Sequence, residues 1–193
     1  MLDHQSVLFF ILGAIVIILI SVIYYFVNLN KNNHLNLKQL LLKTLFAIYI
    51  IGVISITILP IYIPDIFAPE SRVLLFNIIP FHSISELILS AGEGGVYISI
   101  AFSNILGNLL IFVPLGFALP IIFKKINNLP KTLLIAFSIS LLIEAIQFIL
   151  TYLQLSSMRA SDIDDVILNV LGALIGYVLF LIVCRRKEGK AQA

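Results

Sequence analysis

The stretch RASDIDDVILNVLGALIGYVLFLIV (residues 159–183) combines a charged beginning with a long apolar run. A helix needs about 20 residues to cross the roughly 30 Å hydrocarbon core of a bilayer, and residues 163–183 are long enough. The charged part contains Arg159 and three aspartates, and Asn169 lies well inside the apolar run. Polar side chains within a span usually face a bundle interior or a water-filled cavity. The stretch therefore predicts a membrane helix that forms one wall of a polar site.

The composition of the chain supports a membrane protein. Of its 193 residues, 61% are hydrophobic and 11% are charged, whereas a soluble domain has roughly 25% charged residues. Four more segments are long and apolar enough to span, at residues 7–27, 40–59, 104–123 and 133–153. The sequence predicts an all-α, polytopic transmembrane bundle of about five spans. The first run has no basic region before it, so we expect a span and not a cleavable signal peptide.

Basic residues predict the orientation of the spans, because Lys and Arg are enriched in cytoplasmic loops. Ten of the twelve fall in or beside the first connection, in the third connection, or in the tail of residues 184–193. The other two, Arg72 and Arg159, fall in the second and fourth connections. We therefore expect the amino terminus outside and the carboxyl terminus in the cytoplasm. No basic patch is interleaved with aromatics, which argues against a nucleic-acid partner.

The second connection is a long loop that we expect outside the cytoplasm. Four prolines between residues 60 and 80 prevent one continuous helix there. Residues 83–90 are expected to form a short helix in the membrane interface, and a re-entrant loop remains an alternative.

Polar residues of the fourth predicted span share one helical face: Ser140, Glu144, Gln147 and Thr151. Glu144 lies about 16 Å from the cytoplasmic end of that span, at 1.5 Å per residue. A charge near the midplane costs on the order of 3 kcal/mol, so such a residue usually faces the bundle interior and takes part in function.

The fifth predicted span also has one polar face: Asp162, Asp165, Asn169, Gly172 and Gly176. The two glycines form a GxxxG motif, which lets another helix approach closely. An alternative for Asp162 is that it only caps the helix. Asp164 is off this face, and we expect it to be solvated.

The third predicted span places Asn104 and Asn108 on one face, followed by Pro114 and Gly116. Pro114 is expected to kink the helix. The two amides either join a polar site or only form hydrogen bonds between helices. By the expected topology, the polar faces of all three spans meet in the outer half of the bilayer, as the wall of a cavity open to the outer face.

Four segments resemble the signature blocks of the VanZ-like membrane proteins, and they occur in the family's order: NIIPF (77–81), NILGNLLIFVPLG (104–116), IEAIQ (143–147) and RASDIDDVILNVLG (159–172). The resemblance covers roughly residues 70–183. It implies a division into amino-terminal spans with the start of the outer loop (1–69), a VanZ-like domain (70–183) and a basic cytoplasmic tail (184–193).

The resemblance implies a multi-pass protein of the bacterial cell membrane. The family is named for a protein that gives low-level resistance to teicoplanin, a lipoglycopeptide that binds cell-wall precursors outside the membrane. The candidate ligand-binding residues are Asn77, Asn104, Asn108, Glu144, Gln147, Arg159, Asp162, Asp165 and Asn169. The candidate structural residues of the motifs are Pro80, Phe81, Pro114, Gly116, Gly172 and Gly176.

Three functions stay open from the sequence. The first is binding of a cell-envelope lipid, a lipid-linked cell-wall precursor or a lipoglycopeptide, which contributes to resistance. The second is an intramembrane enzyme on a lipid-linked phosphate, with Glu144, Asp162 and Asp165 as candidate catalytic residues. A divalent cation at the two aspartates would need a third ligand such as Asn108. The third, a small transporter, is less favoured because the chain has no internal repeat.

Overall fold

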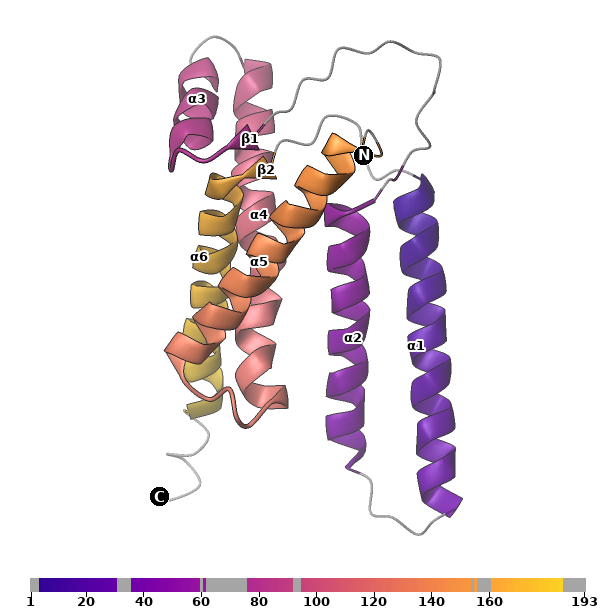
Figure 1. Ribbon diagram of the computed structural model, residues 1–193. Coiled ribbons are helices and arrows are strands. Elements are labelled where there is room, and N and C mark those ends of the chain that lie inside the picture. Colours follow the sequence, from indigo (N-terminus) through magenta and orange to yellow (C-terminus); the bar gives the residue numbers. More distant parts are fainter. Residues whose placement is uncertain are drawn as a thin grey trace. The chain divides into compact units, whose positions relative to one another are not determined.

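The computed structural model describes residues 4–30, 36–59, 61, 76–91, 95–153, 155 and 161–185 (Figure 1). The chain divides into two compact units, Met1–Ile61 and Tyr62–Ala193. Among the described residues, five helices are long and apolar enough to cross a membrane. The prediction of a helical, multi-pass membrane protein with five spans is confirmed.

The first unit is a pair of helices, α1 (His4–Asn30) and α2 (Leu37–Thr57). The two pack against each other along their length. A hydrogen bond of 2.8 Å from Thr44 Oγ1 to Ser21 Oγ joins them. Asn36 caps the start of α2 with its side-chain oxygen.

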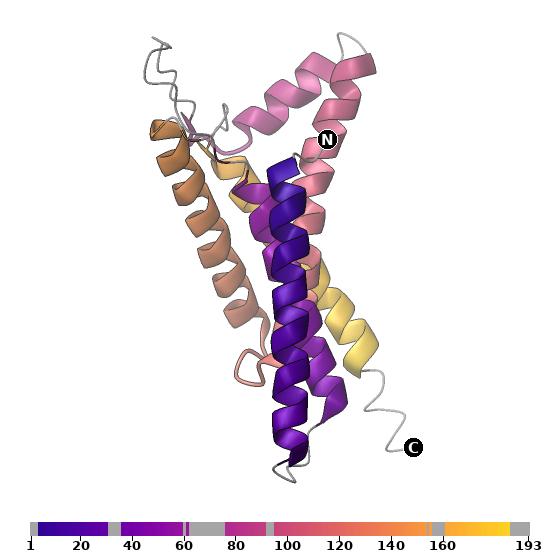
Figure 2. The ribbon, with the colours of Figure 1, turned by 90° about the vertical axis from the view of Figure 1, so that its right-hand side faces the viewer.

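The second unit contains the remaining helices: α3 (His82–Ala91), α4 (Gly95–Ile122), α5 (Leu129–Tyr152), α6 (Ile163–Phe180) and the π-helical turn η1 (Leu181–Arg185) that continues α6. The short helix that the sequence predicts in the second connection is confirmed as α3. Figure 2 shows α3 running obliquely away from the beginning of α4.

Two helices begin earlier than the sequence predicts. α4 starts at Gly95 instead of residue 104, because residues 95–103 contain no proline to stop it. It continues through Pro114 and Pro120. α5 starts at Leu129, where Asn128 accepts a hydrogen bond from the Lys131 N–H (3.1 Å) and a proline stands in the first turn.

Glycines bring α4 and α6 into backbone contact, and these two helices share the most extensive interface of the unit. A Cβ atom on any of three glycines would overlap a backbone carbonyl oxygen of the other helix. The pairs are Gly116 with Ala173, Gly172 with Leu109, and Gly176 with Val113. The two glycines of the GxxxG motif of α6 therefore let the backbone of α4 approach closely, as such motifs do in pairs of membrane helices.

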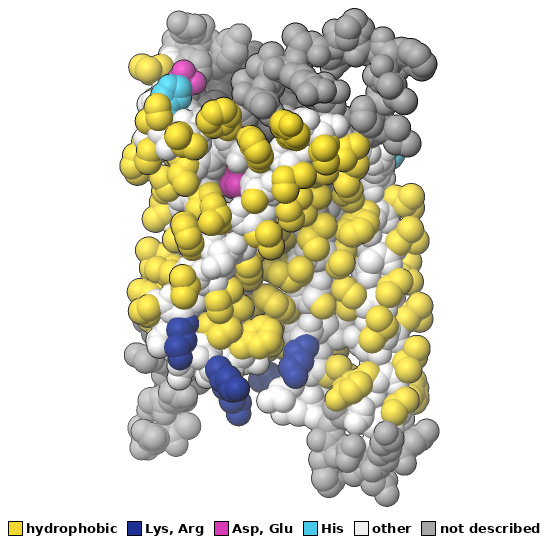
Figure 3. Space-filling model, viewed as in Figure 1, with side chains coloured by type: hydrophobic (Ala, Val, Ile, Leu, Met, Phe, Trp, Pro, Cys, Tyr) yellow, Lys and Arg dark blue, Asp and Glu magenta, His cyan; other side chains and the backbone are white. Residues whose placement is uncertain are grey.

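The outer surface of the second unit is apolar, as expected for helices in contact with lipid. Leu134 and Leu142 of α5 are 64% and 60% exposed, and many similar side chains surround them. Figure 3 shows lysine side chains at one end of this unit and acidic side chains at the other. The lysines belong to the connection between α4 and α5 and to the start of α5.

Candidate functional site

A short parallel strand pair begins the polar site. β1 (Phe76–Asn77) pairs with β2 (Ser161–Asp162), so that Asn77 lies beside Asp162. The pair joins the segment before α3 to the segment before α6 (Figure 1). The sequence analysis gave no indication of these strands, because two residues are too few to show an alternating pattern.

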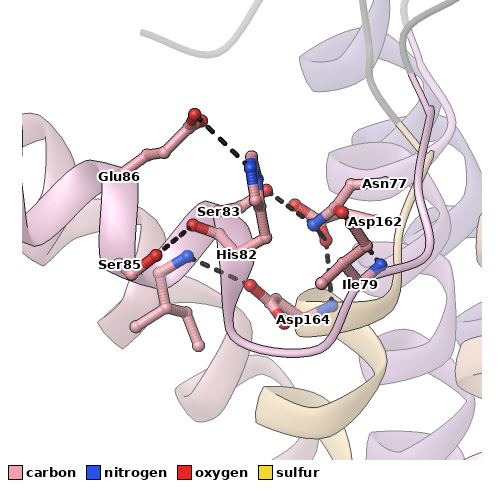
Figure 4. A network of polar contacts seen from close by, with 9 residues as sticks. Asn77, Ile79, His82, Ser83, Ser85, Glu86, Asp162 and Asp164 are labelled. Carbon is pink, nitrogen blue, oxygen red and sulfur yellow. Dashed lines mark hydrogen bonds and ion pairs between the residues drawn. The ribbon is translucent and has the colours of Figure 1, made fainter.

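Asp162 is the N-cap of α6, as the capping alternative expects, but capping is not its only contact. Its Oδ1 accepts the Asp164 N–H at 2.9 Å, and the residue is buried. The same oxygen accepts a hydrogen bond of 2.9 Å from Asn77 Nδ2. The amide of Asn77 also donates to Ser83 Oγ and accepts the Ile79 N–H, at 3.0 Å each (Figure 4). Asp162 thus fixes the NIIPF segment against α6.

Asp164 was expected to be solvated, and this prediction is wrong. The side chain is among the most buried of the chain, at 1% exposure. Its two oxygens accept the N–H groups of Phe81 and Ile84, the latter at 3.0 Å, at the start of α3. A carboxylate at a helix N-terminus satisfies free N–H groups and favours the helix dipole. Phe81 adopts a left-handed backbone (φ 66°), which turns its N–H toward Asp164.

Glu144 connects α5 to the beginning of α6. Its side chain is buried, and its Oε2 accepts the Asp162 N–H at 2.8 Å. Ser161 Oγ donates to the backbone carbonyl of Glu144 at 3.3 Å. The Glu144 carboxylate therefore binds the backbone of β2 and joins α5 to that strand.

Two further contacts lie between the helices. Asn108 of α4 donates its amide N–H to Asp165 of α6, and Asn169 donates to Ser140 Oγ of α5 at 2.8 Å. Asn169 is 4% exposed, and its Oδ1 has no hydrogen-bond partner in the described part of the protein. The polar faces of the three helices are thus brought together in one unit.

Some of the predicted site residues lie elsewhere. Asn104 is exposed, one turn before Asn108, and Gln147 is half-buried but does not line the pocket described next. Arg159 lies outside the described residues. His82 forms an exposed pair with Glu86 (3.6 Å), on the surface of α3 (Figure 4).

A pocket of about 500 Å³ opens beside Glu144. Its polar lining consists of Asn77, Glu144, Ser161 and Asp162. Its walls come from β1, α5 and the start of α6, and they are mainly apolar: Phe76, Ile78, Leu141, Ala145, Phe148, Ile149, Ile163 and Val166. In Figure 3, acidic surface is visible within the hydrophobic face of this unit. The sequence analysis missed these walls, since their apolar residues resemble all other lipid-facing residues.

Among the described residues, the charged groups that line the pocket are the carboxylates of Glu144 and Asp162. In the described part of the chain, no lysine or arginine forms an ion pair with Glu144, Asp162 or Asp165. Within the same residues, no three His, Cys, Asp or Glu side chains lie close enough together to hold a metal ion. Among the described residues, the polar groups that line the pocket are carboxylates, an amide and a hydroxyl.

These features define a multi-pass membrane protein with a polar site and an apolar pocket at one end of a three-span unit. Residues 46–184 match the VanZ/LLP1 family, which is more than half of the chain, and the chain belongs to this family. Protein VanZ of Enterococcus faecium is 38% identical over 79 residues, which are 41% of this chain and 45% of that protein. The aligned part thus spans less than half of the length of this relative. No solved structure matches the chain.

Proposed function

We propose that this VanZ-family protein binds an amphiphile of the cell envelope in the pocket beside Glu144 and thereby contributes to teicoplanin resistance. The observation that carries the proposal is the pocket itself: apolar walls that are open to lipid, with a buried carboxylate at one side. Ligand sites are mostly apolar concave surfaces with a few placed polar groups that orient the ligand.

The proposal places the pocket at the outer leaflet of the cell membrane. The lysines between α4 and α5 lie at the opposite end of this unit, and lysine-rich ends are usually cytoplasmic. At the outer leaflet the pocket would meet both the lipid-linked cell-wall precursors and the acyl chain of a lipoglycopeptide. Holding either of them would lower the amount of antibiotic on its target.

An intramembrane enzyme on a lipid-linked substrate is the second candidate. It is favoured by the position of Glu144, whose carboxylate is buried, lines the pocket and has one backbone hydrogen bond. Such a group is suited to act as a general base. Resistance would then result from a changed lipid and not from a bound one, so the two candidates differ in whether lipid is converted.

The proposal is tested by filling the pocket. Ala145→Phe adds a ring at the pocket wall on α5, whereas Leu142→Phe changes a lipid-facing residue that does not line it. Both variants are produced in a bacterium that lacks other glycopeptide resistance, and teicoplanin tolerance is compared at equal protein levels. We expect Ala145→Phe to lose tolerance and Leu142→Phe to keep it. Full tolerance with Ala145→Phe would contradict a role for the pocket.

A further inference from the structure

We propose that the ligand of this pocket is an apolar chain that carries a protonated amine, and that Glu144 binds the amine. The inference rests on the proposed function, because it names the chemical class of the ligand at that same site. It follows from three properties of the described residues: the surface of the walls, the hydrogen bonds already formed at the polar side, and the charge of the groups there.

The walls are suited to a hydrocarbon chain that enters from the lipid. Five large hydrophobic side chains of the pocket are substantially exposed on the outer surface: Phe76 (59%), Ile78 (74%), Leu141 (48%), Phe148 (39%) and Ile149 (53%). In a bilayer these side chains contact acyl chains, so the pocket is continuous with the lipid phase. A chain can therefore enter sideways while its polar group stays near the level of β1 and β2.

Of the two carboxylates that line the pocket among the described residues, Glu144 is the one placed on a wall helix, α5, and it can accept a hydrogen bond from a ligand. Asp162 Oδ1 already accepts two hydrogen bonds, from Asn77 and from the Asp164 N–H. The Asn77 amide is itself bonded to Asp162, Ser83 and the Ile79 N–H. Glu144 accepts the Asp162 N–H at Oε2, and the Ser161 side chain also interacts with its carboxylate. A carboxylate has about four acceptor positions, so Glu144 can still accept from a ligand.

The charge of the described pocket lining favours a cation over an anion. The described residues that line the pocket include two carboxylates and no basic side chain, and Asp165 lies close enough to Glu144 to repel it electrostatically. A phosphate would add another negative charge in a site of low polarity. An ammonium group would instead form short, charge-assisted hydrogen bonds with Glu144.

The test uses three brominated probes with the same chain, dodecylamine, dodecanol and dodecyl phosphate, added to the full-length protein in lipid nanodiscs at neutral pH. The chain contains no tryptophan, so Phe148→Trp places a single tryptophan in the pocket wall, whose fluorescence a brominated chain quenches on contact. Phe137→Trp, on the same helix but outside the pocket lining, reports the probe dissolved in the bilayer.

We expect dodecylamine to quench Phe148→Trp at a concentration about tenfold lower than dodecanol or dodecyl phosphate does. The reason is that its ammonium group forms a hydrogen bond to a charged group, Glu144. Glu144→Gln in the same background should abolish this preference. Phe137→Trp should show no preference among the three probes. A preference for dodecyl phosphate would overturn the inference while leaving an occupied pocket. If no probe quenches Phe148→Trp more strongly than Phe137→Trp, the pocket is not occupied, and the proposed function fails as well.

Competition then separates the two natural sources of the ligand. Displacement of brominated dodecylamine by phosphatidylethanolamine, the amine-bearing bilayer lipid, would assign the pocket to a lipid. Displacement by teicoplanin would assign it to the antibiotic. Displacement by neither would contradict both as the natural occupant.

Discussion

The backbone N–H of Asp162 and the carboxylate of Glu144 form a 2.8 Å hydrogen bond that joins α5 to the beginning of α6. The bond holds one oxygen of Glu144 in place and leaves the rest of the carboxylate at the pocket. Burying a carboxylate in a membrane span is costly unless it is paired or used. The Asp162 N–H and the Ser161 hydroxyl are neutral donors and a weak compensation for that cost, which supports a functional role for Glu144.

Asp164→Ala should destabilise the second unit by about 2 kcal/mol or more, because it leaves the N–H groups of Phe81 and Ile84 without their charged acceptor. The measurement is the free energy of unfolding in mixed micelles. Glu86→Ala removes the exposed pair with His82 and is the matched control, which should cost much less. Equal losses from the two variants would contradict the capping role of Asp164.

Gly172→Leu should strongly lower the amount of folded protein, because the Gly172 Cα lies against the Leu109 carbonyl, and neither backbone can move aside. Gly13→Leu, in α1, should do less, since a Cβ there meets only the end of the flexible Ile51 side chain. Folded protein is measured by fluorescence-detected size exclusion.

Gly107→Ala is the negative control for this experiment. A Cβ at Gly107 has nothing within 4 Å, so the variant should fold as well as the original chain. If Gly172→Leu and Gly13→Leu reduce the folded amount equally, the close contact of α4 with α6 does not determine the folding of the second unit.

The orientation can be tested with a reporter enzyme that is active only outside the cytoplasm. Fusion at residue 90 should give activity, and fusions at residues 33, 128 and 190 should give none, because the lysine-rich connections are expected inside. Activity at residue 128 would invert the topology and would place the pocket at the cytoplasmic leaflet.

Glu144 and Arg159 should contribute to stability independently of each other. Arg159 is the one basic residue in the four segments that resemble the family's blocks, so it is the candidate partner for a structural ion pair with Glu144. If Glu144 is functional and not half of such a pair, the coupling in a double-mutant cycle of Glu144→Gln and Arg159→Gln should be below about 0.5 kcal/mol. A double mutant that regains the stability lost in both single mutants would show a structural pair.

Hydropathy and helical spacing were sufficient to predict the spans and the polar faces. Residues such as Glu144, Asp165 and Asn169 could be identified as site candidates, because a charged or amide side chain in an apolar run is costly unless it is paired or used. Asp164 was misjudged, because its partners Phe81 and Ile84 are about 80 residues away in the sequence, and no local period indicates a contact at that separation. The pocket could not be predicted either, since it depends on how Phe76 and Ile78 pack beside α5.

The contact of Glu144 with a ligand is tested most directly by the teicoplanin tolerance of Glu144→Gln. The substitution keeps the size of the side chain and an oxygen for the Asp162 N–H, but it removes the charge that faces the pocket. Glu86→Gln makes the same change on the exposed surface of α3 and serves as the control. At equal, near-normal levels of both proteins, we predict that Glu144→Gln abolishes tolerance and that Glu86→Gln retains it. Normal tolerance in a well-produced Glu144→Gln protein would contradict the proposed role of Glu144.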